Sequence, residues 1–131
     1  MVLAIFLVTA TLNDLYNRTI PNLLLIGMFL YSIYLNHNSF PAFFISLLIS
    51  SLIILPLYKL NFFAGGDAKL LIILGTIVGY SNLHYLFSII FIIGGFQGLI
   101  CKVFQNKNKT PGNIPYALSI FIGYIIFFYY F

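Results

Sequence analysis

The amino-acid sequence predicts an all-α integral membrane protein with six transmembrane helices. Of its 131 residues, 62% are hydrophobic and only 6% are charged, whereas a soluble domain carries roughly 25% charged residues. The mean hydropathy is +1.07, so lipid rather than water must surround most of the chain. Polar breaks divide the sequence into six apolar stretches, one for each expected helix.

The apolar stretches cover about residues 2–12, 21–35, 40–57, 68–80, 83–104 and 114–131. A helix needs about 20 residues to cross a hydrocarbon core of ~30 Å, and the first, second and fourth stretches are shorter than this. We therefore expect their helices to continue into the flanking polar residues, or the bilayer to thin around them. Helices satisfy their backbone hydrogen bonds internally, as lipid requires, and no strict alternation of apolar and polar residues indicates a β-barrel.

Local signals define the first three helices. The first stretch resembles the core of a signal peptide, but it lacks a preceding basic region and a following small-x-small cleavage site, so we expect a retained helix. Pro21 suits the first turn of the second helix, where its missing N–H costs nothing. The polar run Asn36-His37-Asn38-Ser39 separates the second helix from the third.

The last three helices carry packing signals as well as breaks. Gly75 and Gly79, and likewise Gly94 and Gly98, have the small-xxx-small spacing that is typical of helix-packing faces. Gln97 is a polar residue inside the fifth stretch, and we expect it to form a buried hydrogen bond between helices. The most polar segment, residues 105–113, separates the fifth helix from the sixth.

The positive charges predict the orientation. With six helices, every Lys and Arg falls at a connection on one side of the membrane: Arg18, Lys59, Lys69, Lys102, Lys107 and Lys109. The positive-inside rule makes this side cytoplasmic and places both termini on the extracytoplasmic side. Although the net charge is +4, these scattered charges form no basic face, so we expect no nucleic-acid partner.

The sequence has only two acidic residues, Asp14 and Asp67, and both fall in connections on the cytoplasmic side. Ionisable groups at the ends of membrane helices cost free energy unless they are paired or hydrated, and those that persist usually have a function. Two neighbouring carboxyls share one proton and titrate as a unit. In that state one takes a proton from water while the other donates to the carbonyl oxygen of a scissile peptide bond.

The sequence lacks the motifs that metalloproteases and serine hydrolases require. His37 and His84 lie on the opposite side from the acids, and the single Cys101 permits neither an internal disulfide nor a cysteine-based zinc site. The chain has no HExxH and no Gly-x-Ser-x-Gly motif. We therefore expect no metal and no cofactor.

The sequence around each acid is distinctive. Asp67 follows Gly65 and Gly66, which can adopt conformations closed to other residues and permit close approach of another chain. Asp67 could also be a helix N-cap. Lys69 could tune the acids, bind a substrate carboxylate, or anchor the helix at the membrane interface. Asp14 is followed at a short distance by Ile20-Pro21-Asn22 at the start of the second helix.

These motifs resemble those of the type IV prepilin peptidases, which are membrane aspartyl proteases with a Gly-x-Gly-Asp motif. The resemblance rests on residues 14–22, on residues 64–70 and on Ile114-Pro115-Tyr116-Ala117. It is strongest to the short forms that serve Flp-type (tight-adherence) pili, because the longer forms insert a zinc-binding domain associated with N-methylation between the first two helices. It therefore implies a single peptidase domain over residues 1–131. Ala64 stands where the motif has its first glycine.

The resemblance implies an aspartic endopeptidase in which Asp14 and Asp67 are catalytic. It further implies an active-site loop and a helix-2 entry motif, formed by Ala64, Gly65, Gly66 and Lys69 and by Ile20, Pro21 and Asn22. The substrate would be a prepilin or pseudopilin precursor, an apolar helix preceded by a basic leader. Cleavage would follow a glycine at the cytoplasmic face of the bacterial inner membrane, in a multi-pass enzyme.

Two other classes of function stay open at this point, as do the identity of the pilin and the oligomeric state. A small ion-coupled membrane transporter would use the two acids as ion sites, although transport acids usually lie near mid-membrane. An inactive scaffold subunit of a secretion machine would need neither acid.

Overall fold

The computed structural model describes residues 2–104 and 116–131, and this part of the chain folds into six helices with no strand. The helices are α1 (Val2–Asn17), α2 (Asn22–Leu35), α3 (Phe40–Lys59), α4 (Gly65–Val78), α5 (Leu83–Phe104) and α6 (Tyr116–Tyr130). Each corresponds to one predicted apolar stretch. The predicted all-α class with six helices is therefore confirmed for the described residues.

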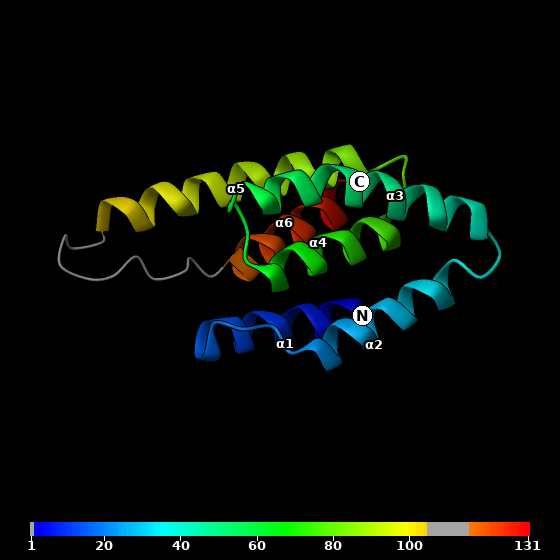
Figure 1. The fold of residues 1–131 in the computed structure, drawn as a ribbon, viewed down its shortest axis with the longest axis horizontal. Helices are drawn as coiled ribbons and strands as arrows, with labels where there is room; N and C mark the ends of the chain where they lie inside the picture. Colours follow the sequence, from blue (N-terminus) through cyan, green and yellow to red (C-terminus); the bar gives the residue numbers. More distant parts are fainter. Residues whose placement is uncertain (1, 105–115) are drawn as a thin grey trace.

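The helices lie lengthwise beside one another, and successive helices run in opposite directions (Figure 1). α4 packs against α2, α3, α5 and α6, whereas α1 packs against α2 and α6. The α1–α2 and α3–α4 connections therefore meet at one end of the bundle, and α6 begins at the same end. The α2–α3 and α4–α5 connections lie at the opposite end (Figure 1).

Two short stretches extend into polar residues, as predicted. α1 continues to Asn17 and α4 begins at Gly65, so each acid lies inside a helix rather than in a connection. Asp14 is in the last turn of α1 and Asp67 is in the first turn of α4. Pro21 occupies the N-cap position of α2, one residue before the first turn in which it was expected.

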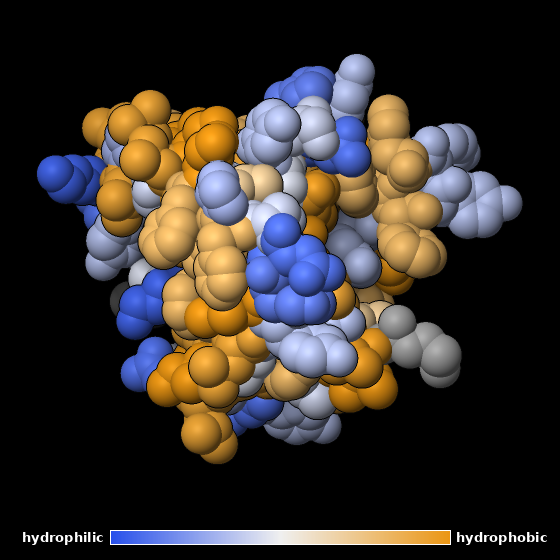
Figure 2. Space-filling view, turned by 90° about the vertical axis from the view of Figure 1, so that its right-hand side faces the viewer, coloured by the Kyte–Doolittle hydropathy of each residue, from blue (hydrophilic) through white to orange (hydrophobic). Residues whose placement is uncertain are grey.

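The outer surface of the bundle is apolar. Large hydrophobic side chains on several helices are highly exposed, such as Leu23 at 82%, Leu52 at 69% and Val103 at 79%. Figure 2 looks onto the end with the α2–α3 connection, where hydrophilic patches stand among mainly hydrophobic residues. Within the described residues, α3 and most of α5 are long and apolar enough to span a membrane, and α1, α2 and α6 are shorter apolar helices.

Small residues bring the helices together in the core. A Cβ on Gly75 would lie 2.7 Å from Cβ of Ser50 in α3, and one on Gly94 would overlap the ring of Tyr116 at the start of α6. The packing role predicted for these two glycines is confirmed. The prediction for Gly79 is wrong: this residue caps α4 with φ of 85°, and an added Cβ would meet nothing within 4 Å.

Gln97 joins two helices, as predicted. Its side-chain oxygen accepts a hydrogen bond from the Ser119 hydroxyl, which links α5 to α6. α6 is thereby fixed to α5 along its first turns.

Candidate active site

Asp14 is held at the end of α1 by the beginning of α6. Its side chain is only 6% exposed, and its Oδ2 accepts a hydrogen bond of 3.3 Å from the backbone N–H of Ala117. The first N–H groups of a helix have no partner within the helix, and the positive end of the helix dipole favours a carboxylate. α6 therefore supplies both a donor and a favourable field to Asp14.

Asp67 is the third residue of α4 and is only 3% exposed. The Ala64 backbone N–H donates to its carboxylate, which is one half of a capping box. The alternative in which Asp67 itself is the N-cap is wrong, because the helix already begins at Gly65 and Ala64 occupies the N-cap position. Asp67 Oδ1 is buried and has no hydrogen-bond partner within the part of the chain that the structure describes, which is rare for a buried polar atom.

The two glycines before Asp67 serve close approach rather than unusual backbone angles. Gly65 and Gly66 lie in the first turn of α4, and neither has a positive φ, so the expected special backbone conformation is wrong. A Cβ on Gly66 would lie only 3.2 Å from Cβ of Ile20, which is itself buried. A Cβ on Gly65 would lie 3.6 Å from the Tyr58 hydroxyl, which is ordinary contact. Gly66 thus lets the helix-2 entry motif pack directly on α4.

Ala64 fits its position without strain. Its φ of −69° and ψ of 156° are extended values that any L residue adopts. The replacement of the first motif glycine by alanine therefore needs no adjustment of the backbone.

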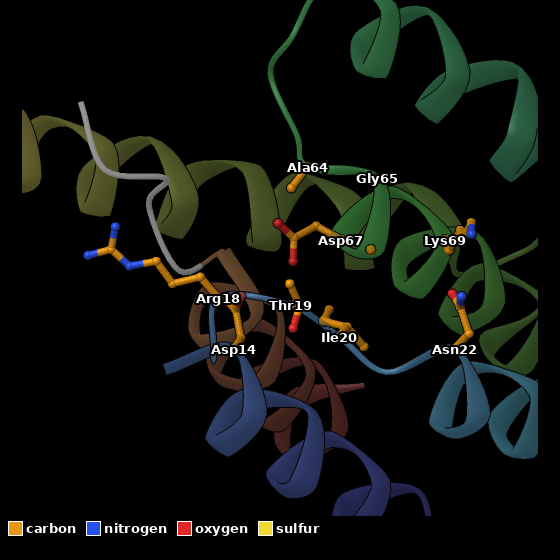
Figure 3. A pocket seen from close by; sticks show the side chains of 10 residues that line it. Asp14, Arg18, Thr19, Ile20, Asn22, Ala64, Gly65, Asp67 and Lys69 are labelled. Carbon is orange, nitrogen blue, oxygen red and sulfur yellow. The ribbon is translucent and has the colours of Figure 1, made fainter. Parts of the chain in front are cut away.

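Both acids line one cavity of ≈ 230 Å³, which we call the acid pocket. Its lining residues come from the end of α1, the α1–α2 connection and the start of α4: Asp14, Arg18, Thr19, Ile20, Asn22, Ala64, Gly65, Gly66, Asp67 and Lys69. The two carboxyl groups point into the space between α1 and α4, whereas the Arg18 side chain extends away from them (Figure 3). Of the residues expected in the catalytic pair, the active-site loop and the helix-2 entry motif, only Pro21 is absent from this lining.

The sequence did not reveal every residue of the site. Thr19 lines the acid pocket, and Ala117 holds Asp14 across 103 positions of sequence. The segment Ile114-Pro115-Tyr116-Ala117 was a signal for the start of the last helix, but its first two residues lie outside the described part of the chain. Nothing in the local sequence indicated that this helix start meets Asp14.

Burial shapes the protonation of the pair. Both acids lie outside the apolar stretches 2–12 and 68–80. Burial raises the pKa of Asp67 to about 7, the negative charge of Asp14 adds to this effect, and the Ala64 N–H opposes it. Burial also raises the pKa of Asp14, against the Ala117 N–H, which lowers it. Near neutral pH the pair is therefore close to holding one proton, as acid–base chemistry requires.

The described residues contain no cluster of three or more His, Cys, Asp or Glu side chains that could hold a metal ion. His37 and His84 lie beyond α2 and at the start of α5, at the end of the bundle away from the acids. The polar side chains that line the acid pocket are those of the two acids, Lys69, Arg18, Thr19 and Asn22, and the Arg18 side chain extends away from the acids.

Comparison with known proteins gives one family. The sequence model of the type IV leader peptidase family matches residues 1–101, a range that contains both acids and the whole lining of the acid pocket. No curated protein and no solved structure matches the chain.

Proposed function

The chain belongs to the type IV leader peptidase family, and we propose that it is an aspartic endopeptidase in which Asp14 and Asp67 are the catalytic pair. The observation that carries this proposal is the position of the only two acids of the chain. They come from different helices, are both buried, and line one pocket. Burying two carboxyls together is costly, and catalysis accounts for that cost.

The surroundings of the acids suggest their roles. Asp67, with its pKa near 7, keeps the shared proton and donates it to the carbonyl oxygen of the scissile bond. Asp14, supported by the α6 N-terminus, takes a proton from water as the water oxygen attacks the carbonyl carbon. As the tetrahedral intermediate collapses, the C–N bond breaks, the proton held by Asp14 passes to the leaving amine, and one hydroxyl of the intermediate returns its proton to Asp67.

The family implies prepilin-type substrates. We propose that this chain removes the basic leader of a prepilin or pseudopilin precursor by cleaving after a glycine.

We also propose that all six helices cross the bacterial inner membrane as one domain, with the acid pocket on the cytoplasmic face. Four positive residues support this orientation because they lie toward the end of the bundle that carries the acids: Arg18, Lys59, Lys69 and Lys102. Lys107 and Lys109 lie outside the described residues. The α1–α2 connection is only residues 18–21, which leaves no room there for a zinc-binding insertion.

The transporter alternative has no supporting observation. Both acids lie in terminal helical turns at one end of the bundle, whereas ion-coupling acids usually lie near mid-membrane.

The decisive test is leader removal from a co-expressed prepilin by Asp14→Asn and Asp67→Asn variants. We expect each variant to accumulate at the wild-type level in the membrane and to leave the precursor uncleaved, with a loss of at least about 10³-fold in rate. Asn38→Ala is the matched control, because this exposed polar residue lies in the α2–α3 connection at the opposite end of the bundle. Normal cleavage by either aspartate variant would refute the pair.

A further inference from the structure

A groove between α2 and α4 adjoins the acid pocket. It has a volume of ≈ 460 Å³ and is lined by Asn22, Leu25, Ile26, Phe29, Lys69, Ile72 and Ile73. We call it the α2–α4 groove. Asn22 and Lys69 also line the acid pocket, so the two hollows are continuous. Figure 3 shows Asn22 on α2 and Lys69 on α4 at the same side of the acid pocket.

The groove changes from polar to apolar along its length. Its two polar residues stand at the acid end, and all the others are apolar. From Asn22 to Phe29 the groove follows α2 for seven residues, which is roughly 10 Å or two helical turns. On α4 the apolar residues Ile72 and Ile73 follow Lys69 by three and four positions, so they lie on the same face of the helix.

We propose that the α2–α4 groove binds the first two turns of the apolar helix that follows the scissile bond of the precursor. This inference rests on the proposed function. A precursor whose scissile bond lies between the acids must continue away from them, and its apolar segment needs an apolar path. The α2–α4 groove provides that path from the edge of the acid pocket.

The polar residues at the acid end of the groove, Asn22 and Lys69, also suit the precursor. A substrate helix must be unwound at the scissile bond so that its peptide group reaches the acids, and the unwound residues leave carbonyl oxygens without helical partners. The Asn22 amide and the Lys69 ammonium are donors placed at this junction. They bind those carbonyl oxygens while the apolar turns lie against Leu25, Ile26 and Ile72.

A lipid chain or a second copy of the protein would also cover an apolar groove, but neither needs continuity with the acid pocket. A different hollow, lined by Ala4, Tyr124, Ile125, Phe128 and Tyr129, shares no residue with the acid pocket. A lipid chain has no need to prefer one hollow over the other, whereas the precursor requires the α2–α4 groove.

The first test is site-directed disulfide cross-linking in membranes, in a Cys101→Ser background. Ile26→Cys places a thiol in the groove, and Leu23→Cys is the matched control because Leu23 is on α2, 82% exposed and outside the groove lining. We expect Ile26→Cys to cross-link to cysteines placed in the first two turns after the cleavage site, and Leu23→Cys not to do so. Equal cross-linking of both, cross-links only between two copies of the enzyme, or none to the precursor would overturn the proposal.

The second test fills the groove. Ile26→Trp should raise KM for the full precursor by about tenfold with kcat little changed, because it removes binding shared by ground state and transition state. Cleavage of a short peptide that lacks the apolar helix should not change, and Leu23→Trp should behave as wild type. If the wild type cleaves the precursor and Ile26→Trp has the same KM, the groove proposal is wrong but the proposed function is unaffected. If the wild type cleaves nothing, the proposed function fails.

Discussion

The two acids of the pocket are both buried but have different hydrogen-bond partners. Asp14 lies at the end of α1 and accepts a hydrogen bond from the N-terminus of α6, a contact between distant parts of the sequence. Asp67 lies at the start of α4 and accepts the local N–H of Ala64, and its buried Oδ1 has no hydrogen-bond partner among the described residues. The surroundings of Asp14 are more favourable to a carboxylate than those of Asp67, because the Ala117 N–H lowers the pKa of Asp14 against the effect of burial.

This difference shows how two identical side chains can take opposite roles. A negative charge at a helix N-terminus is favoured, but a second charge beside it in a buried site is not. The two acids therefore differ in protonation because Asp67 is buried beside a second charge, whereas Asp14 meets the N-terminus of α6. Changes to the protonation or the surroundings of either acid should therefore alter the rate of cleavage.

The pH dependence of cleavage gives the largest effect. Asp67 must hold its proton, and its pKa is about 7, so kcat/KM should fall about tenfold for each pH unit above 7. The rate should also fall on the acid side, once the pH drops below the pKa of Asp14, which lies above its usual value. The measurement is initial cleavage rate in detergent from pH 4 to 9, with circular dichroism to show that the helices persist. A rate that stays constant to pH 9 would remove Asp67 as the proton donor.

Gly94→Ala tests the contact that holds Asp14 from a distance. The added Cβ would overlap the ring of Tyr116, and this ring also packs edge-on against Phe63, with centroids 4.9 Å apart. Tyr116 directly precedes Ala117, so its displacement moves the N–H that binds Asp14. We expect a loss of about tenfold in kcat/KM and of about 1–3 kcal/mol in stability, as for other overpacked sites.

Gly95→Ala is the matched control for Gly94→Ala, because a Cβ at Gly95 would meet nothing within 4 Å. In a helix interior this change should stabilise the protein slightly, by about 0.5–1 kcal/mol, without loss of cleavage. Equal behaviour of the two variants would show that the start of α6 does not control Asp14.

Much of the fold and the local motifs could be predicted from the sequence because they depend on neighbouring residues. The apolar stretches located all six helices, and α5 begins at Leu83 as predicted. The extension of α4 into polar residues was expected, but the residue at which it begins was not, because glycine disfavours helices, yet Gly65 and Gly66 are helical here. Packing of Ile20 against Gly66 accounts for this, and such a long-range contact has no local signal.

The site was predictable only in part for the same reason. Rarity and motif context identified Asp14 and Asp67, because each acid carries its own local pattern. The hydrogen bond from Ala117 and the buried, unpartnered oxygen of Asp67 depend on three-dimensional packing. The sequence therefore indicated which acids to examine, and the packing distinguishes one acid from the other.

Gly66→Ala changes the packing of α4 next to Asp67. The new Cβ would lie 3.2 Å from Cβ of Ile20, so α4 and the helix-2 entry must separate by a few tenths of an ångström. We expect kcat/KM to fall by about threefold to fivefold, since small displacements of a catalytic group are costly. Gly65→Ala, which makes only ordinary contact with Tyr58, should lose less. A larger loss in Gly65→Ala would mean that backbone flexibility, not close packing, is what the motif requires.

Ala64→Gly has the smallest expected effect, and it restores the glycine of the family motif. At this N-cap position glycine is preferred over alanine, but glycine also increases the entropy of the unfolded chain, by about 0.4–1 kcal/mol. These contributions oppose each other, and the Ala64 N–H that binds Asp67 is present in both forms. Cleavage rate should therefore stay within about twofold of wild type. Because φ and ψ at Ala64 suit any residue, a large gain in rate would show that the loop must visit a second conformation during turnover, one that alanine restricts.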